Sequence, residues 1–289
     1  MKVNAMIIGA GRSGTTSVYE YLAAHPEVDF SITKELHYFS LDDLYARGEK
    51  YFHSFFEHPE KKISITADTY LLIDTKAPER ICRYNPAMKC IIMLREPVAR
   101  SYSNFLYSVN FGHEPASANF LQTMEAEKQV LATGDIVEQN NRCHFYGSLY
   151  HRHLEFWRSY FPKEQLLIYR MNDLQNDPEK FYKQLCADLG LNYQPFDKKE
   201  QAFNRSTGVK SKWLQQFLLN RESPLRRFAS FMLRPFRKWV IKSGVIDKVY
   251  ALNKKEIPAQ PLNEADQQQA AVYFRSDLQL LERDYGIRF

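Results

Sequence analysis

The chain lacks the long apolar runs of a membrane protein. Its longest purely apolar runs are about five residues, as in Cys90 to Leu94, whereas a bilayer span needs about 20. Glycine (11) and proline (13) are also scarce among 289 residues, which excludes collagen-like and linker-rich chains. With 44% hydrophobic and 14% aromatic residues, the chain can form a buried core, so a disordered protein is excluded as well.

Cysteine is rare, and the four cysteines form no CxxC pair. Cys90 falls inside an apolar run that we expect to be a buried strand; the others are Cys82, Cys143 and Cys186. This pattern predicts free thiols in a reducing cytoplasm and no zinc site. Lys and Arg (39) exceed Asp and Glu (34) only slightly, for a net charge of +5. That balance suits an anionic ligand or surface, and we expect no nucleic-acid partner.

The N-terminus has a short apolar stretch that superficially matches a secretory leader. It runs from Lys2 to Ile8, is interrupted by Asn4, and leads directly into Gly11-Arg12-Ser13-Gly14. Because the stretch is too short for a leader, we expect a strand here.

Apolar, β-rich runs alternate with helical patterns along most of the chain. Such alternation predicts an α/β fold, with a central parallel sheet flanked by helices on both faces. We expect a single P-loop-like domain over 1–289, with the α/β core at 1–200 and a basic loop and C-terminal helices at 201–289. Strands are expected at 4–8, 63–67, 89–94 and 166–169, and helices at 15–24, 77–84, 98–109, 119–133, 145–160, 179–189 and 264–283.

A glycine-bearing turn joins the first predicted strand to the first predicted helix. It reads Gly9-Ala10-Gly11-Arg12-Ser13-Gly14-Thr15-Thr16. Backbone N–H groups of such a turn, together with the helix N-terminus, bind a phosphate-like oxyanion; the alternative is an ordinary tight turn. The glycine spacing fits a Walker A loop, but Thr15 stands where the lysine belongs. Arg12 is the only cation of the turn, so we expect an anion site without metal chemistry.

A second anion site is predicted after the strand at 89–94. Arg95 follows that strand directly, where a nucleoside triphosphatase would place an acidic Mg²⁺ ligand. Pro97 suits the first turn of a helix, on which Arg100 and Ser103 share a face. Two anion sites at neighbouring strand ends imply a ligand with two separated phosphate-like groups. The alternative is that Arg95 and Arg100 form surface ion pairs, for instance with Glu96.

An acid–base pair is predicted in Lys34-Glu35-Leu36-His37-Tyr38-Phe39. Glu35 and His37 alternate, so on an extended segment they face the same side. A carboxylate beside an imidazole can deprotonate an acceptor hydroxyl. The alternative is a surface charge cluster with a half-buried histidine.

These three segments, in this order, resemble the sulfotransferase superfamily, whose donor is 3′-phosphoadenosine 5′-phosphosulfate (PAPS). The stretch 7–16 is similar to the 5′-phosphosulfate loop of the family, and 94–103 is similar to its 3′-phosphate motif. The stretch 34–39 is similar to the KExHFF segment of carbohydrate-type members, which act on heparan-like glycans, and of bacterial relatives. The resemblance covers most of the first 190 residues.

The resemblance implies a role for each matched residue. Glu35 would be the catalytic base with His37 beside it, and Arg12, in place of a family lysine, would contact the bridging oxygen of the donor. Arg95 and Ser103 would bind the 3′-phosphate. The other donor-binding residues would be Gly11, Ser13, Gly14, Thr15 and Thr16, with Arg205 and Lys210 from a late basic loop that closes over the nucleotide.

The chain departs from the family pattern on the acceptor side. Ala67-Asp68-Thr69-Tyr70 only loosely matches the TPSY element of the family. Thr66 stands where a substrate-contacting lysine is common, and Ser40 replaces an acidic residue.

The resemblance implies in-line transfer of a sulfuryl group from PAPS to a hydroxyl, with PAP released and no metal required. The acceptor stays open among a glycan, a glycolipid and a small-molecule alcohol, as does the oligomeric state. One alternative is a P-loop kinase-like phosphotransferase, which the missing lysine and Mg²⁺ ligand disfavour. Another is a non-catalytic nucleotide- or polyanion-binding protein, which the presence of both Glu35 and Arg12 disfavours.

Residues 224–243 carry basic and aromatic residues but no acidic one. The simpler interpretation is two amphipathic helices with their aromatic side chains in the core. A second interpretation adds contact with an anionic acceptor or an anionic membrane surface. Because the chain starts at its first strand, whereas Golgi relatives have an anchor and stem, we expect a cytoplasmic enzyme, with peripheral contact at the inner membrane face as the second option.

Overall fold

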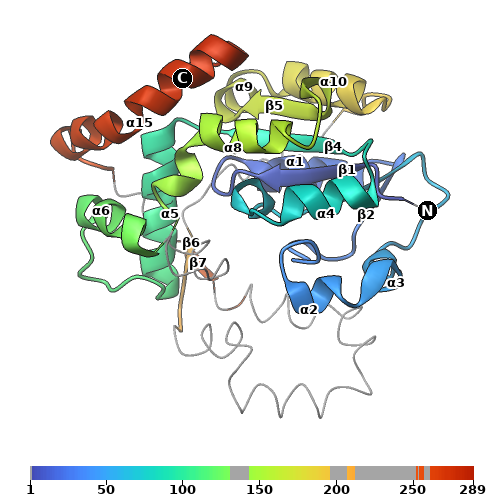
Figure 1. The fold of residues 1–289 in the computed structure, drawn as a ribbon, viewed down its shortest axis with the longest axis horizontal. Coiled ribbons are helices and arrows are strands. Elements are labelled where there is room, and N and C mark those ends of the chain that lie inside the picture. The colour runs from blue at the N-terminus through green and yellow to red at the C-terminus, as the bar shows by residue number, and fades with distance from the viewer. Residues whose placement is uncertain (1, 131–142, 196–206, 212–251, 253, 257–260) are drawn as a thin grey trace.

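A five-stranded parallel sheet forms the centre of the computed structural model, which describes residues 2–130, 143–195, 207–211, 252, 254–256 and 261–289 (Figure 1). Its order is β2-β3-β1-β4-β5, and every neighbouring pair is parallel. The predicted α/β fold is therefore confirmed. The strands are β1 Ala5–Gly9, β2 Val28–Phe30, β3 Ile63–Ala67, β4 Lys89–Leu94 and β5 Leu166–Arg170.

Both faces of the sheet are buried, because successive residues of the central strands point to opposite sides. In β1, Met6 and Ile8 pack into one hydrophobic cluster, whereas Ala5 and Ile7 pack into another. Helices α4 (Ala77–Tyr84) and α8 (Tyr150–Arg158) cover the first face. The second face is covered by α1 (Thr15–Ala24), α9 (Met171–Asn176) and α10 (Pro178–Leu189). A ligand then has access at the carboxyl ends of the strands.

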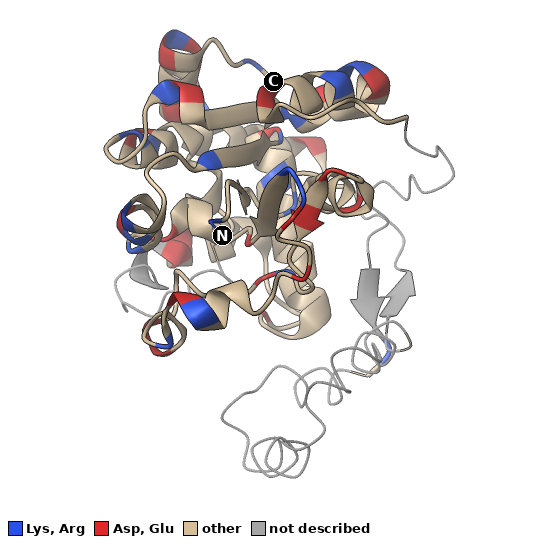
Figure 2. Ribbon diagram, turned by 90° about the vertical axis from the view of Figure 1, so that its right-hand side faces the viewer, with Lys and Arg blue, Asp and Glu red and all other residues tan. Residues whose placement is uncertain are grey.

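Further helices extend this core. A third hydrophobic cluster joins α5 (Pro97–Phe111), α6 (Phe120–Val130) and α15 (Glu264–Tyr285). Lys, Arg, Asp and Glu are interspersed on the outer helices (Figure 2). The short elements are α2 Asp42–Tyr45, α3 Gly48–His53, the 3-10 turns Leu71–Ile73, Tyr146–Ser148 and Lys163–Gln165, and the antiparallel pair β6 Thr207–Val209 and β7 Lys254–Glu256.

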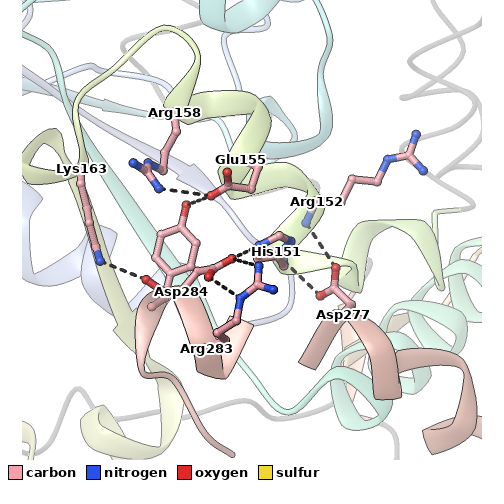
Figure 3. A network of polar contacts seen from close by, with 9 residues as sticks. His151, Arg152, Glu155, Arg158, Lys163, Asp277, Arg283 and Asp284 are labelled. Atoms are coloured by element: carbon pink, nitrogen blue, oxygen red, sulfur yellow. Dashed lines mark hydrogen bonds and ion pairs between the residues drawn. The ribbon is translucent and has the colours of Figure 1, made fainter. Parts of the chain in front are cut away.

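Polar contacts fasten α15 to α8 (Figure 3). The carboxylate of Asp277 accepts hydrogen bonds from the backbone N–H groups of His151 and Arg152, at 3.1 and 3.2 Å. These N–H groups lie in the first turn of α8 and have no acceptor within that helix, so Asp277 satisfies them as a capping residue would. Asp284 lies 2.8 Å from Nε2 of His151. The last helix is thus bound to the core by hydrogen bonds as well as by packing.

Most predicted elements agree with the structure, but the expected strands and helices do not include β2, α2, α3, β6 and β7. The single helix expected at 145–160 is a 3-10 turn followed by α8, and the short helix α9 was not predicted. Glu35 and His37 are not extended, as described below. All four cysteines are free, as expected. Among the described helices, none has the length and apolar character to cross a membrane. Arg205 and the tract 224–243 lie outside the described residues, and the division at residue 200 stays a prediction.

Candidate functional site

The loop between β1 and α1 forms an anion cradle. Gly9 has a φ of +152°, and a Cβ there would lie 2.7 Å from Cβ of Leu72 and 3.1 Å from the carbonyl oxygen of Thr69. Only glycine allows this close approach. Gly14 is the N-cap of α1 and lies in the left-handed region; no side chain of the described residues caps the helix, and its first turn has no acidic residue. The first N–H groups of α1 therefore stay available to an external anion.

A pocket of about 670 Å³ opens beside this loop. Of the predicted donor-binding residues, Gly11, Arg12, Thr15 and Thr16 line it. Ser13 is fully buried beneath its surface, next to the hydroxyl of Tyr150. Four of the six predicted loop residues therefore line the same pocket. Of the other two, Ser13 lies below the pocket surface and Gly14 is the N-cap of α1.

Arg12 links the two predicted anion sites. Its Nε donates to Oγ of Ser103 at 3.3 Å, and its guanidinium lies 5.1 Å from the ring centre of Tyr107. Nη1 of Arg95 donates to the carbonyl oxygen of Arg12 at 3.4 Å. Burial lowers the pKa of Arg12, and the positive charges of Arg95 and Arg100 lower it further. The structure thus brings residues 12, 95 and 103 together, and their role in donor binding stays a prediction.

Arg100 is a brace for the loop rather than a surface ion pair. It is 5% exposed, and its Nε donates to the carbonyl oxygen of Gly11 at 3.1 Å. Its Nη1 donates to the carbonyl oxygens of Cys143 and His144, at 2.8 and 3.2 Å. Glu96, the ion-pair partner considered above, instead caps α5 by accepting from the N–H groups of residues 98 and 99. The surface ion-pair alternative is therefore wrong for Arg100.

Arg12, Arg95 and Arg100 bring three positive charges to the site. None of the three pairs with a carboxylate in the part of the chain that the structure describes. A guanidinium held away from bulk water favours a counter-anion strongly. The arrangement therefore attracts an anionic ligand.

Glu35 and His37 line the same pocket, but the expectation of an extended segment is wrong. Their φ values are 53° and 52°, in the left-handed region that residues with side chains seldom adopt. The backbone N–H of Glu35 donates to the carbonyl oxygen of Ala67 at 2.8 Å, and that of His37 donates to Oδ2 of Asp68 at 2.8 Å. Contacts with the end of β3 thus hold both residues in this conformation, and strained backbone of this kind concentrates at functional sites.

Thr69 positions the Glu35 carboxyl group. Its N–H donates to Oε2 at 3.0 Å and its hydroxyl donates to Oε1 at 2.9 Å. Side-chain atoms of Glu35, His37 and Asp68 lie within 4.8 Å of one another. Because protein donors already occupy both Glu35 oxygens and one Asp68 oxygen, these side chains form a hydrogen-bond network. Burial, and next the charge of Asp68, raises the pKa of Glu35 to about 8.

Sequence reasoning noted residues 67–70 as a loose match to a family element but gave Asp68, Thr69 and Tyr70 no role in the site, and it missed Tyr107. Tyr70 and Tyr107 line the pocket, and burial raises the pKa of Tyr70 well above its usual range. The sequence signal for residues 68–70 was their position, because they directly follow β3 at the carboxyl edge of the sheet. Lys210 is exposed directly after β6, which packs against α5.

Comparisons with known proteins agree with this geometry. The Sulfotransferase domain family matches residues 2–221. Heparan sulfate glucosamine 3-O-sulfotransferase 5 of Mus musculus is 30% identical over 176 residues, 60% of this chain and 49% of the relative. Bifunctional heparan sulfate N-deacetylase/N-sulfotransferase 2 of Homo sapiens is 29% identical over 202 residues, 64% of this chain and 22% of the relative. The chain thus spans about half the length, or less, of these curated relatives.

A solved structure shares the fold over the whole chain. The crystal structure of a sulfotransferase from Alicyclobacillus acidocaldarius has a TM-score of 0.67, at 17% identity, and covers 100% of this chain and 98% of the other. The family match over most of the chain, on this fold and around this anion cradle, shows that the protein belongs to the sulfotransferase domain family.

Proposed function

We propose that the protein transfers a sulfuryl group from PAPS to a hydroxyl of a glycan-type acceptor. The observation that carries the proposal is the set of three arginines, Arg12, Arg95 and Arg100, which meet at the loop before an uncapped helix N-terminus and have no paired carboxylate among the described residues. PAPS has two anionic ends, and its phosphosulfate supplies the group to be transferred.

The residues present fit such a donor. Arg12 and the N-terminus of α1 would hold the 5′-phosphosulfate, and Arg95 and Ser103 would hold the 3′-phosphate. As the bond to the leaving phosphate breaks, Arg12 and the helix dipole stabilise the charge that develops there. Because fixed donors supply this stabilisation, we expect turnover to persist when divalent cations are chelated.

Glu35 is the proposed base. The acceptor O–H bond breaks as its oxygen forms a bond to sulfur, the proton passes to Glu35, and the sulfur–oxygen bond to PAP breaks with its electron pair. Glu35 suits this step because it lines the pocket next to the loop, and because Thr69 fixes both of its oxygens.

The names of the relatives support a glycan acceptor, since both act on heparan sulfate. A glycolipid is the second acceptor that we propose to test. We further propose that the protein is cytoplasmic and that residues 224–243 make peripheral contact with an anionic membrane. The kinase-like alternative is disfavoured, since Thr15 replaces the phosphate-binding lysine.

Calorimetric titration with PAP, with ATP and Mg²⁺, and with heparin tests the donor. We expect tight binding of PAP and weak binding of ATP, and an acceptor screen with labelled PAPS and a chelator then tests transfer. Tight ATP–Mg²⁺ binding without PAP binding would contradict the proposal.

A further inference from the structure

One buried carboxylate oxygen at the site has no hydrogen-bond donor among the described residues. Asp68 is 4% exposed, and its Oδ2 accepts from the backbone N–H of His37 at 2.8 Å and lies 3.4 Å from Nδ1 of the same residue. Its other oxygen, Oδ1, is buried and receives no hydrogen bond from an N–H or hydroxyl group of any residue that the structure describes. A buried charged oxygen without a donor costs free energy, and folded proteins avoid it.

The carboxyl group of Glu35 is the group placed to supply that donor. A side-chain oxygen of Glu35 lies within 4.8 Å of a side-chain oxygen of Asp68. Both oxygens of Glu35 accept from Thr69, so the group is held in a fixed orientation beside Asp68. Two carboxylates this close repel each other unless one of them keeps a proton.

We propose that Glu35 and Asp68 share one proton in a carboxyl–carboxylate hydrogen bond, and that Asp68 is thereby a positioning residue for the base. The part that concerns catalysis rests on the proposed function, whereas the shared proton does not.

The surroundings favour a proton on Glu35 and charge on Asp68. Burial alone would raise the pKa of Asp68, but the charge of His37 and the hydrogen bonds from His37 and Glu35 together lower that pKa below its usual range. The pKa of Glu35 is raised to about 8, by burial first and by the charge of Asp68 second. Other charged or titratable groups near the pair are Tyr70, Asp74, Tyr107 and Arg100, with Arg12, Lys34 and His113 in the lining of the same pocket.

Asp68 would then make Glu35 a stronger base. When Glu35 is ionised and takes the proton of the acceptor hydroxyl, the new carboxyl O–H donates to Asp68 Oδ1, so the charge of Asp68 stabilises the product of proton transfer. The ionised form of Glu35 is the active one, and it accumulates only as the pH rises through about 8.

Carbon-13 NMR of the full chain, with label at the glutamate δ-carbon, tests the shared proton without any substrate. The Glu35 signal is the one that Glu35→Gln removes. In the wild type we expect a titration midpoint near 8. Asp68→Asn keeps an acceptor for the His37 N–H but removes the charge, so the midpoint should fall by about one pH unit or more. Asp29→Asn is the matched control, because Asp29 is an equally buried aspartate of β2, and it should leave the midpoint unchanged.

Two results would overturn the proposal: a wild-type Glu35 midpoint in the ordinary glutamate range near ~4.3, or an Asp68→Asn midpoint equal to that of the wild type. The first needs no variant at the pair, so it holds even where Asp68→Asn fails to fold. In the transfer assay the acid limb of the pH profile should move with the NMR midpoint. A chain that titrates as expected but neither binds PAP nor sulfates any acceptor supports the shared proton and refutes the proposed function.

Discussion

Replacing Gly147 by alanine tests whether Arg100 shapes the anion cradle. A Cβ at this position would lie 2.5 Å from Nη1 and 2.9 Å from Nη2 of Arg100, closer than real Cβ contacts. The guanidinium would have to withdraw, since a buried 3-10 turn surrounds Gly147. Withdrawal breaks the bonds from Nη1 to Cys143 and His144 and loosens the bond from Nε to Gly11.

The expected loss follows from these bonds. A hydrogen bond from a charged donor contributes about 1.5–3 kcal/mol, so losing two of them costs at most about 6 kcal/mol. Partial relaxation recovers part of this, and we expect the free energy of unfolding to fall by about 3 kcal/mol. For a chain of this size that lowers the melting temperature by roughly 6–12 °C. PAP affinity should also fall, by about tenfold, because Gly11 loses its brace.

Differential scanning calorimetry and PAP titration measure both effects. Gly190→Ala is the control: a Cβ there meets nothing within 4 Å, although its φ of +73° adds strain of about 1–2 kcal/mol. If Gly147→Ala melts no lower than this control and binds PAP as the wild type does, Arg100 does not hold the loop in the way described.

Three further predictions concern the donor, the base and the last helix. Arg95→Ala should weaken PAP about 10- to 100-fold and adenosine 5′-phosphosulfate, which lacks the 3′-phosphate, far less; equal losses in calorimetry would refute the 3′-phosphate assignment. Glu35→Gln should slow transfer about 10²–10⁴-fold with PAP affinity kept; an active variant, with His37→Ala inactive instead, would reverse the roles. Asp277→Ala should lower the free energy of unfolding by about 1–2 kcal/mol in urea, because two N–H groups of α8 lose their acceptor, and an unchanged midpoint would show that packing alone fastens α15.

The strands and most helices were predictable because their signals are local. Continuous apolar runs mark β1 and β4, and Pro97 and Gly112 bound α5 at its first residue and its C-cap. The single helix expected at 145–160 failed for a reason that is not local. The turn around Gly147 packs against Arg100, some 47 residues earlier in the chain, and nothing in its own sequence announces that contact.

The candidate site likewise contains residues that a local sequence pattern predicts and residues that no local pattern predicts. The loop at 9–16 and the arginine after β4 carry short sequence patterns, so the sequence could predict that residues 11, 12, 95 and 103 lie close together. Asp68 could not, because its role depends on the neighbouring segment around Glu35 and on the left-handed backbone at residues 35 and 37. The sequence analysis placed Glu35 and His37 side by side because it took their segment to be extended, and that reason is wrong. The actual reason is that the backbone N–H groups of Glu35 and His37 donate hydrogen bonds to Ala67 and Asp68. The end of β3 therefore positions the proposed base.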